Sequence, residues 1–483
     1  MLKISHFCEG TFIHTFHQPY WVIVIDFELF QNLSMKIVII GGVAAGAKVA
    51  AKSRRLLPDA EISIYTQDTH VSYSACGLPY YIQGNFEDWR KLIVRSKEEF
   101  EKSNINIYIK HKVIKILPID KKIIVKNLEN DEQFFVNYDK LVIATGSVPR
   151  VADFQNKNLK NIFTLKTLED GIAIRETMQR VNNITLIGGG YINIELLEAF
   201  VKNGKHVTLV ERAPFILSVF DEDIASLIQN YILENCSGLV KIITDDIVSE
   251  FLGEDTVKGV LTAKGSGFET EMVVISAGVR PVVDIAEDAG IALGITGAIK
   301  VNSRMETSIN DIYACGDCCE KINMISNTPV WIPLGSTANK EGRVAAVNLC
   351  GGSEDFEGIL GSAVTRYMDL NISLSGLSEK NAQKLGYDTV SVVVTKKDKA
   401  GYMPEVENIT LKLVADRRSH RILGAQAIGC GDADKKVNSI SIGLAQRITV
   451  EQLLDVDLTY APPFSTSVDI IHSAARMLKS KLS

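Results

Sequence analysis

The stretch KIVIIGGVAAGAKVAAKSRRL, residues 36–56, decides how the first half of the chain folds. An apolar run predicts a buried strand, an alanine-rich run predicts a helix, and glycines separate the two. In this order, backbone amides at the start of the helix can face a pyrophosphate with no side chain between them. Gly41 and Gly46 have the spacing of the first and third glycines of a dinucleotide-binding turn, with Val43 in the second position. The expected cofactor contacts are Gly41, Gly42, Val43, Ala44, Ala45 and Gly46.

The acidic residue that would bind a ribose is missing from its usual place in this first copy. The next strand-like run, EISIYT, ends at Thr66, and Asp68 follows two residues later. We retain Asp68 as a cofactor-binding candidate.

A second copy of the pattern is NITLIGGGYINIELLEAF, residues 183–200, followed by HVTLVER. Asn193 replaces the third glycine, and we expect it to loosen the packing of helix on strand. Glu211 lies at the end of the next strand, where an acid accepts hydrogen bonds from a ribose 2'-OH and repels a 2'-phosphate. This favours NADH, although the adjacent Arg212 leaves NADPH possible. The candidates in this copy are Gly188, Gly190, Tyr191, Ile192, Glu195 and Glu211.

Two turns imply two bound nucleotides, and the simplest combination is a flavin dinucleotide with a nicotinamide dinucleotide. The alternative is that such turns also occur in α/β proteins that bind no dinucleotide. Two copies, each between a strand and a helix, favour binding.

Composition limits the number of domains and the classes of binding partner. The chain has 483 residues, enough for roughly three domains. Its net charge of -6 gives no basic excess for nucleic acid. Eight scattered cysteines indicate neither a disulfide framework nor a metal site, although Cys315, Cys318 and Cys319 cluster. We expect a soluble cytoplasmic protein without a metal, nucleic-acid or membrane partner.

Residues 1–34 differ from the rest of the chain. Their apolar run YWVIVIDFELF contains Asp26 and Glu28 and is too short for a membrane span. Because MKIVIIGG from Met35 is typical of a protein start, we expect residues 1–34 to be an upstream extension or a mis-assigned start.

Three further segments carry a family resemblance: LVIATGSVPR (141–150), VVISAGVRP (273–281) and IYACGDCCE (312–320). With the two turns, they resemble the pyridine nucleotide-disulfide oxidoreductases from Met35 almost to the C-terminus. The resemblance implies that Asp317 holds the ribityl chain of FAD and that IPLGSTANKEGR (332–343) passes close to the isoalloxazine. The further cofactor candidates that it implies are Ser72, Thr145, Gly146, Gly278, Asp317 and Thr337.

The resemblance also implies an α/β fold with two Rossmann-like domains and a C-terminal α+β dimerisation domain. We expect a FAD domain at 35–149 and 276–355, interrupted by an NAD(P) domain at 150–275. Residues 356–483 would form the dimerisation domain, where VSVVVT and ITLKLVAD are strand-like and KKVNSISIGLAQ is helix-like.

Cys76, in VSYSACGLPYYIQG (71–84), is the candidate redox centre. No second cysteine lies between residues 41 and 140, which excludes a dithiol pair. The chain therefore resembles the single-cysteine members: coenzyme A-disulfide reductases, NADH oxidases and NADH peroxidases. If GLPYYI begins a helix, its dipole would lower the pKa of the thiol. The alternative is a buried, inert cysteine.

The residues expected around Cys76 separate these groups. Oxidases and peroxidases carry a histidine in the first turn, where Ala44 stands here. The segments KAGYMPEVENITLKLV and LTYAPPFS resemble those of coenzyme A-disulfide reductases, in which tyrosines matching Tyr402 and Tyr460 reach the active site from the partner subunit. We expect both to act in catalysis in a homodimer. The alternative for each is an amphipathic residue at an interface.

The first helix adds a clue to the substrate. Lys48, Lys52 and Arg55 fall on one helix face and could receive the phosphates of coenzyme A, unless the face is simply solvated. Arg55 matches a coenzyme A-contacting arginine of the family, whereas Ala75 replaces a polar residue and weakens selection for coenzyme A. The substrate-binding candidates are Lys52, Arg55, Ser72 and Ala75.

The sequence thus predicts a FAD-dependent enzyme that passes electrons from NAD(P)H to Cys76, which reduces coenzyme A disulfide. The alternatives are an NADH oxidase or peroxidase that uses a cysteine sulfenic acid, and a polysulfide or coenzyme A-persulfide reductase. From another class, a redox sensor or electron-carrier flavoprotein also fits.

Overall fold

A computed structural model describes residues 34–151 and 154–482. The prediction that residues 1–34 form an extension or a mis-assigned start lies, but for Ser34, outside these ranges. Among the helices of the described residues, none combines the length and the apolar composition needed to span a bilayer. In the same ranges, no group of three His, Cys, Asp or Glu side chains is placed to hold a metal ion.

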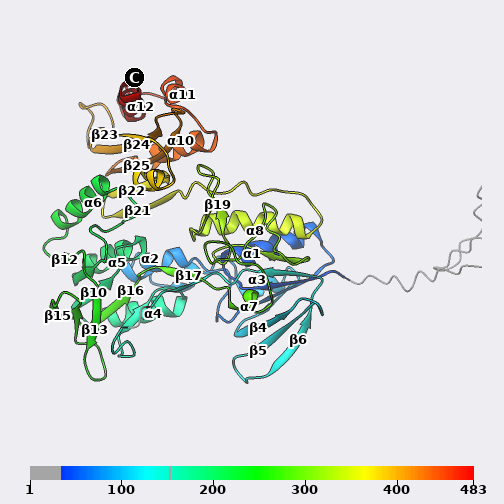
Figure 1. Ribbon diagram of the computed structural model, residues 1–483. Helices are drawn as coiled ribbons and strands as arrows, with labels where there is room; N and C mark the ends of the chain where they lie inside the picture. The colour runs from blue at the N-terminus through cyan, green and yellow to red at the C-terminus, as the bar shows by residue number, and fades with distance from the viewer. Residues whose placement is uncertain (1–33, 152–153, 483) are drawn as a thin grey trace, which may run out of the picture.

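A parallel sheet underlies the first glycine turn (Figure 1). Its order is β18-β7-β1-β2-β3, so the chain leaves this sheet after β7 and returns to it with β18. The strands are Lys36–Ile40 (β1), Glu61–Tyr65 (β2), Ile105–Tyr108 (β3), Lys140–Ile143 (β7) and Ile312–Ala314 (β18).

Both faces of this sheet are buried, which explains why β1 is apolar at every position after Lys36. Ile37 and Ile39 pack with helices α1 and α8, whereas Val38 and Ile40 pack with a small antiparallel sheet. The covering elements are Ala44–Leu56 (α1), Gly335–Leu349 (α8), His111–Leu117 (β4), Lys122–Asn127 (β5) and Gln133–Asn137 (β6).

A second parallel sheet, of order β12-β11-β10-β16-β9, underlies the second glycine turn. Its strands are Ile162–Thr164 (β9), Asn183–Ile187 (β10), His206–Val210 (β11), Val240–Ile243 (β12) and Met272–Ile275 (β16). The helices that follow β9, β10 and β11 are Leu168–Met178 (α4), Tyr191–Lys202 (α5) and Glu222–Glu234 (α6). A small antiparallel sheet packs on one face: Val248–Leu252 (β13), Gly259–Thr262 (β14) and Gly267–Glu269 (β15).

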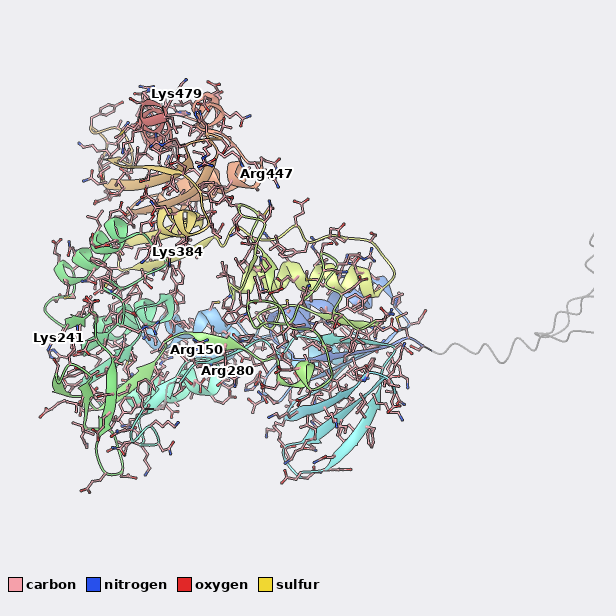
Figure 2. The ribbon with its side chains drawn as sticks, viewed as in Figure 1. Arg150, Lys241, Arg280, Lys384, Arg447 and Lys479 are labelled. Atoms are coloured by element: carbon pink, nitrogen blue, oxygen red, sulfur yellow. The ribbon has the colours of Figure 1, made fainter. Side chains whose placement is uncertain are left out.

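Two short antiparallel strands carry the chain between the sheets. Ser147–Pro149 (β8) pairs with Val279–Pro281 (β17), and the Arg150 N–H donates to the Gly278 carbonyl at 2.9 Å. Figure 2 labels Arg150 and Arg280 at this crossing. The outgoing and returning segments therefore run side by side.

The C-terminal part forms an antiparallel sheet of order β21-β22-β25-β24-β23, at the top of Figure 1. Its strands are Ala363–Tyr367 (β21), Leu370–Gly376 (β22), Thr389–Lys397 (β23), Asn408–Asp416 (β24) and Ile422–Gly429 (β25). The predicted strand-like runs lie in β23 and β24, and the helix-like run lies largely in Ala433–Ala445 (α10). The remaining elements include Lys97–Glu101 (α3), Asp284–Glu287 (α7), Lys321–Ile322 (β19), Pro329–Val330 (β20), Glu379–Lys384 (α9), Val450–Asp455 (α11) and Ile470–Leu482 (α12).

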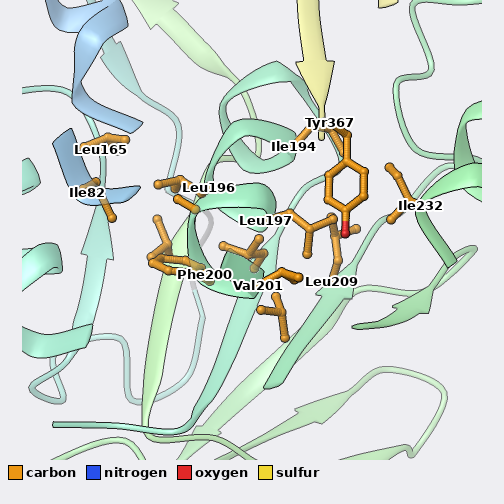
Figure 3. Packing of buried hydrophobic residues seen from close by; sticks show 14 of the residues in the cluster. Ile82, Leu165, Ile194, Leu196, Leu197, Phe200, Val201, Leu209, Ile232 and Tyr367 are labelled. Carbon is orange, nitrogen blue, oxygen red and sulfur yellow. The ribbon is translucent and has the colours of Figure 1, made fainter. Parts of the chain in front are cut away.

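One hydrophobic core joins three parts of the molecule around α5 (Figure 3). Leu197 and Phe200 of α5 pack in the same cluster as Ile82 and Tyr367. Ile82 belongs to Leu78–Gln83 (α2), and Tyr367 ends β21. The segment that carries Cys76 is therefore anchored to the second sheet and to the C-terminal sheet.

A buried cation reinforces the contact between the second and C-terminal parts. Lys412 Nζ of β24 lies 2.8 Å from Asp223 Oδ2, 3.3 Å from Asp221 Oδ2 and 3.0 Å from Glu379 Oε2. Asp221 and Asp223 lie at the start of α6, whereas Glu379 begins α9. This cluster fixes α6 against the C-terminal sheet.

Candidate active site

The first glycine turn lies at the switch point of its sheet. Strand order runs in opposite directions from β1 and β7, so their carboxyl ends border a crevice. Gly41 has a φ of +102°, and a Cβ there would lie 2.2 Å from the Ala144 carbonyl oxygen. A Cβ on Gly46 would lie 1.9 Å from the Gly41 carbonyl oxygen. Both glycines are therefore required by the close approach of backbone to backbone.

The start of α1 is suited to a phosphate. Its N-cap residue, Val43, makes no side-chain cap hydrogen bond, whereas α4 begins with a capping box formed by Thr167 and Asp170. The first amides of α1 thus keep their hydrogen-bonding capacity for a ligand. The turn and its uncapped helix fit the pyrophosphate of a dinucleotide, even with Val43 as the second turn residue.

Asp317 lies at the same edge, in the loop after β18. Its Oδ2 accepts a hydrogen bond from Ser147 Oγ at 2.9 Å and lies 3.9 Å from Lys166 Nζ. Trp331 Nε1 donates to the Asp317 carbonyl oxygen at 2.7 Å. A carboxylate held in this way beside the switch point fits the hydroxyls of a ribityl chain. The residues present therefore fit FAD.

The other residues expected to contact FAD have differing surroundings. Thr145 Oγ1 donates to the Val282 carbonyl at 2.7 Å, and Gly146 has a φ of +73°. Thr337 is buried in the first turn of α8. Asp68 follows β2 beside Glu169 and Lys166. Burial is the main cause that raises the pKa of its carboxyl, and the negative charge of Glu169 adds to the increase.

Cys76 occupies a 3-10 turn, Ala75–Gly77 (η2), immediately before α2. The expected helix is confirmed, with Gly77 as its N-cap and a proline in its first turn. Cys76 is an exposed free thiol, and a Cβ on Gly335, the first residue of α8, would lie 3.9 Å from its Sγ. The cysteine thus faces the segment that the family resemblance implied would pass close to the flavin.

The expected decrease in the pKa of this thiol is wrong. Although Cys76 is exposed at its surface, desolvation by the surrounding protein raises its pKa, as do the carboxylates of Glu195 and Asp317. Lys166 opposes this increase. The six-residue helix α2 does not outweigh two carboxylates facing a partly desolvated sulfur.

Glu195 joins the second domain to this centre. It lies on α5, and its Oε1 accepts a hydrogen bond from Thr365 Oγ1 of β21 at 3.2 Å. Burial raises the pKa of its carboxyl to about 7. Burial is the main cause that raises the pKa of Tyr80 on α2, and the negative charge of Glu195 adds to it. Cys76, Tyr80 and Glu195 therefore form one electrostatically coupled group.

The second glycine turn repeats the geometry of the first. A Cβ on Gly188, which has a φ of +97°, would lie 2.5 Å from the Ser276 carbonyl oxygen. Gly190 is the N-cap of α5 and makes no side-chain cap hydrogen bond. Tyr191 and Ile192 form the first turn of α5, and Gly278 lies beyond β16 with a φ of +101°. This site also fits a dinucleotide.

Glu211 lies at the end of β11, as expected. Its carboxylate accepts hydrogen bonds from the Gly189 N–H and, at 2.7 Å, from the Ala213 N–H. The acid is thus held against the glycine turn, where a ribose bound at that turn would lie.

Asn193 does not loosen the helix, so that expectation is wrong. Its side chain is fully buried, and Nδ2 donates to the Ile187 carbonyl at 2.9 Å and to the Gly188 carbonyl at 2.7 Å. The amide ties α5 to the end of β10, which compensates for the missing glycine.

The substrate candidates surround α1 and the loop before Cys76. Lys52 and Arg55 lie on α1, where Lys52 is half-buried and Arg55 is exposed. Ser72 has a φ of +49°, and its N–H donates to the Gly42 carbonyl at 2.8 Å. Ala75 is partly buried beside Cys76. The loop that leads to the thiol is therefore fastened to the first glycine turn.

Tyr402 and Tyr460 lie in neighbouring loops of the C-terminal part. The Ala400 N–H donates to the Pro462 carbonyl at 3.1 Å, which joins the two loops. The tyrosines are 77% and 52% exposed, so most of each side chain is available to a second molecule. The structure joins the two loops that carry the tyrosines and records no contact of either tyrosine with Cys76 within the described protomer.

Sequence reasoning missed Lys166, Tyr80 and Ser147. Lys166 Nζ lies 3.2 Å from Ser147 Oγ and opposes the increase in the pKa of Cys76. Lys166 follows β9, in a segment without a glycine motif, so only the assembled sheets identify it. Tyr80 lies in the GLPYYI stretch, but its electrostatic interaction with Glu195 depends on the packing of α2 on α5.

Comparison with known proteins identifies the family. A model of the pyridine nucleotide-disulphide oxidoreductases matches residues 35–342, and a model of their dimerisation domain matches residues 362–470. The chain belongs to this family. Membership confirms the predicted α/β fold and the enzyme class, an NAD(P)H-linked flavin-dependent oxidoreductase.

The chain is similar to family members that are named for different activities. The chain is 34% identical to the NAD(P)H coenzyme A polysulfide/persulfide reductase of Pyrococcus horikoshii, over 93% of this chain and 99% of that protein. It is 30% identical to the coenzyme A disulfide reductase of Staphylococcus haemolyticus, over 90% and 98% of the two chains. The structure of the water-forming NADH oxidase of Lactobacillus brevis, bound to NADH, superposes with a TM-score of 0.89 and 28% identity, over 93% and 99%.

Proposed function

We propose that the chain passes electrons from NAD(P)H through FAD to Cys76, which reduces a small disulfide, with coenzyme A disulfide favoured. The observation that carries the proposal is one exposed cysteine beside Asp317 and Glu195, within a fold that holds two uncapped glycine turns. Because no other cysteine occurs between residues 41 and 140, Cys76 forms its mixed disulfide with the substrate.

The two cofactors are assigned to the two turns. Residues 41–46 and Asp317 would hold FAD, and residues 188–190 with Glu211 would hold NAD(P)H. When bound, the flavin supplies two-electron transfer between the nicotinamide and the thiol. We assign the flavin domain to residues 35–149 and 276–355, and the nicotinamide domain to residues 150–275.

Cys76 breaks the substrate's disulfide bond. Its thiolate attacks one sulfur of RSSR, forms a Cys76–S–S–R bond and expels RS⁻, which leaves as RSH after taking a proton. Two electrons and a second proton then split the mixed disulfide, which releases the second RSH and restores the Cys76 thiolate. The sum is RSSR + NADH + H⁺ → 2 RSH + NAD⁺.

We assign proton donation to Tyr402 and Tyr460 of the partner subunit in a homodimer. Their exposure in the protomer and the hydrogen bond that joins their loops support this assignment. Two phenolic groups brought in together can neutralise the leaving thiolate. We place this thiol chemistry in a reducing cytoplasm.

Coenzyme A is favoured by the charge on α1. Lys52 and Arg55 present ammonium and guanidinium groups on the helix that begins at the first turn. Phosphates are bound by such groups. Polysulfide or coenzyme A persulfide is the second candidate, because the Pyrococcus horikoshii relative named for them is 34% identical.

One assay series tests the substrate. NADH consumption by the purified enzyme is compared with coenzyme A disulfide, polysulfide, hydrogen peroxide and oxygen as oxidants. We expect the highest kcat/KM with coenzyme A disulfide. A higher kcat/KM with peroxide or oxygen would refute the proposal, and negligible turnover with every oxidant would favour a redox sensor or electron carrier.

A further inference from the structure

A buried ion pair lies beneath the Asp317 loop. Lys321 Nζ of β19 lies 3.4 Å from Glu341 Oε1 of α8, and the two side chains are 1% and 0% exposed. Removing two such charges from water is unfavourable, and replacing a buried pair with apolar residues is often neutral or stabilising. Stability alone is therefore a weak explanation for this pair.

The two charged groups bind the backbone of the same residue, Gly316. Glu341 Oε2 accepts a hydrogen bond from the Gly316 N–H at 2.6 Å. Lys321 Nζ donates to the Gly316 carbonyl at 2.9 Å and to the Cys319 carbonyl at 2.8 Å. Both polar groups of the Gly316 backbone are thus fixed by a charged partner.

Gly316 is also fixed sterically. Its φ is +87°, and a Cβ there would lie 3.0 Å from the Cβ of Ala45 in the first turn of α1. Cys319 Sγ lies 3.3 Å from the Gly316 carbonyl oxygen and 3.7 Å from Glu341 Oε2. The cysteines that cluster in the sequence, Cys315, Cys318 and Cys319, are fully buried, and the Cys319 thiol contacts Gly316 directly.

Asp317, the next residue, has an independent set of partners. Ser147 and Lys166 contact its carboxylate, and Trp331 contacts its carbonyl oxygen. The loop is therefore held by the ion pair at Gly316 and, independently, by residues of other elements at Asp317. Only the ion pair places an ammonium group and a carboxyl group fully inside the protein, and burial raises the pKa of that carboxyl to about 7.

We propose that Glu341 and Lys321 are positioning residues: they orient the Asp317 carboxylate toward the ribityl chain, and their mutual neutralisation sets the reduction potential of the flavin. The inference rests on the proposed use of FAD, but not on the identity of the disulfide substrate. Loss of the Glu341 charge would leave Lys321 without its carboxylate partner next to the loop that would hold the flavin. That positive charge would stabilise reduced, anionic flavin and shift the potential upward.

The test compares E341Q, E341Q/K321M and D311N, each in the full-length C76S protein so that thiol chemistry does not interfere. Glu341→Gln keeps the side-chain size and an oxygen that can accept the Gly316 N–H. Asp311→Asn is the matched control, because Asp311 binds Lys121 and Lys140 at the opposite end of β18, where it is partly exposed. The readouts are the flavin potential, the FAD dissociation constant and the flavin fluorescence.

For E341Q, measured above pH 7 where the Glu341 carboxyl is ionised, we expect a tenfold shift toward reduced flavin at a fixed solution potential, about 30 mV for two electrons. The double variant should recover the parental potential, because both charges are gone, while binding FAD about tenfold more weakly. D311N should match the parent in both readouts. The double variant leaves no unpaired buried charge, so it also tests the proposal if E341Q fails to fold.

An unchanged potential in E341Q, or unchanged FAD affinity in the double variant, would overturn the inference. An equal potential shift in D311N would also overturn it, since the effect would then not be local. If the parent protein binds no FAD, the proposed function itself fails. The two failures are therefore distinguishable.

Discussion

At the scale of single residues, the reactivity of Cys76 depends on neighbours from separate elements. Glu195 and Asp317 oppose ionisation of the thiol, and Lys166 favours it. In isolation, the position of Cys76 before α2 indicates a lower thiol pKa, but the folded environment raises it. The sequence could identify the cysteine, but it could not reveal which charges face the sulfur.

Substitution of Glu195 should lower the pKa of the Cys76 thiol. Glu195→Gln removes a negative charge that opposes formation of the thiolate. The pH profile of iodoacetamide labelling, read by mass spectrometry on the Cys76 peptide, should therefore move to lower pH. Because Glu195 itself has a pKa of about 7, the difference should be greatest above pH 7 and disappear as that carboxyl becomes protonated.

Glu169→Gln is the control for this measurement. Glu169 acts on Asp68 and Tyr73, and it is not among the groups that change the pKa of Cys76. A labelling profile that stays the same in E195Q, or that moves equally in E169Q, would contradict the electrostatic account.

At the scale of elements, the strand, turn and helix units were predictable because their signals are local. Apolar runs, glycines and helix starts lie within about twenty residues of one another. Asn193 shows the limit of this reasoning. Its replacement of a glycine suggested loose packing, but its buried amide spans β10 and α5 with two hydrogen bonds. A rule based on residue size could not anticipate that compensation.

Gly46→Ala should destabilise the first domain. The new Cβ would lie 1.9 Å from the Gly41 carbonyl oxygen, so the backbone must shift. We expect the free energy of unfolding to fall by about 1–3 kcal/mol, the usual effect of overpacking. FAD affinity should fall with it, measured by equilibrium dialysis.

Gly190→Ala is the matched control for stability. Gly190 has a φ of -82°, and no atom lies within 4 Å of a Cβ placed there. Its free energy of unfolding should not decrease. Equal destabilisation of the two variants would show that the close approach at Gly46 is not the cause.

At the scale of the whole molecule, the match to the family's dimerisation domain, residues 362–470, includes the whole C-terminal sheet. Assembly of Lys166, Glu195 and Asp317 around Cys76 required the relative placement of two sheets. Their side chains come from segments up to about 240 residues apart, which single-sequence patterns cannot bring together.

A mixed dimer tests whether the active site is shared. C76S and the double variant Y402F/Y460F should each be weakly active as homodimers. In the heterodimer, one site would combine an intact Cys76 with intact tyrosines of the partner subunit. Random mixing by co-refolding should restore roughly a quarter of parental activity, because half the dimers are mixed and each has one complete site.

The control for the mixed dimer is co-refolding of two parental chains that carry different affinity tags. The fraction of dimers that retain both tags calibrates the efficiency of exchange. Failure of the first mixture to regain activity, with efficient exchange in the second, would rule out tyrosines acting across the interface.

The central claim is that Cys76 carries electrons from the cofactors to a disulfide. The most direct measurement compares the parent protein and C76S in two reactions: reduction of bound FAD by NADH in a single turnover, and steady-state reduction of coenzyme A disulfide. We predict that C76S retains FAD reduction by NADH. Its disulfide turnover should fall by roughly 10³-fold or more, as expected when a nucleophile is removed. Full disulfide turnover in C76S would contradict the account.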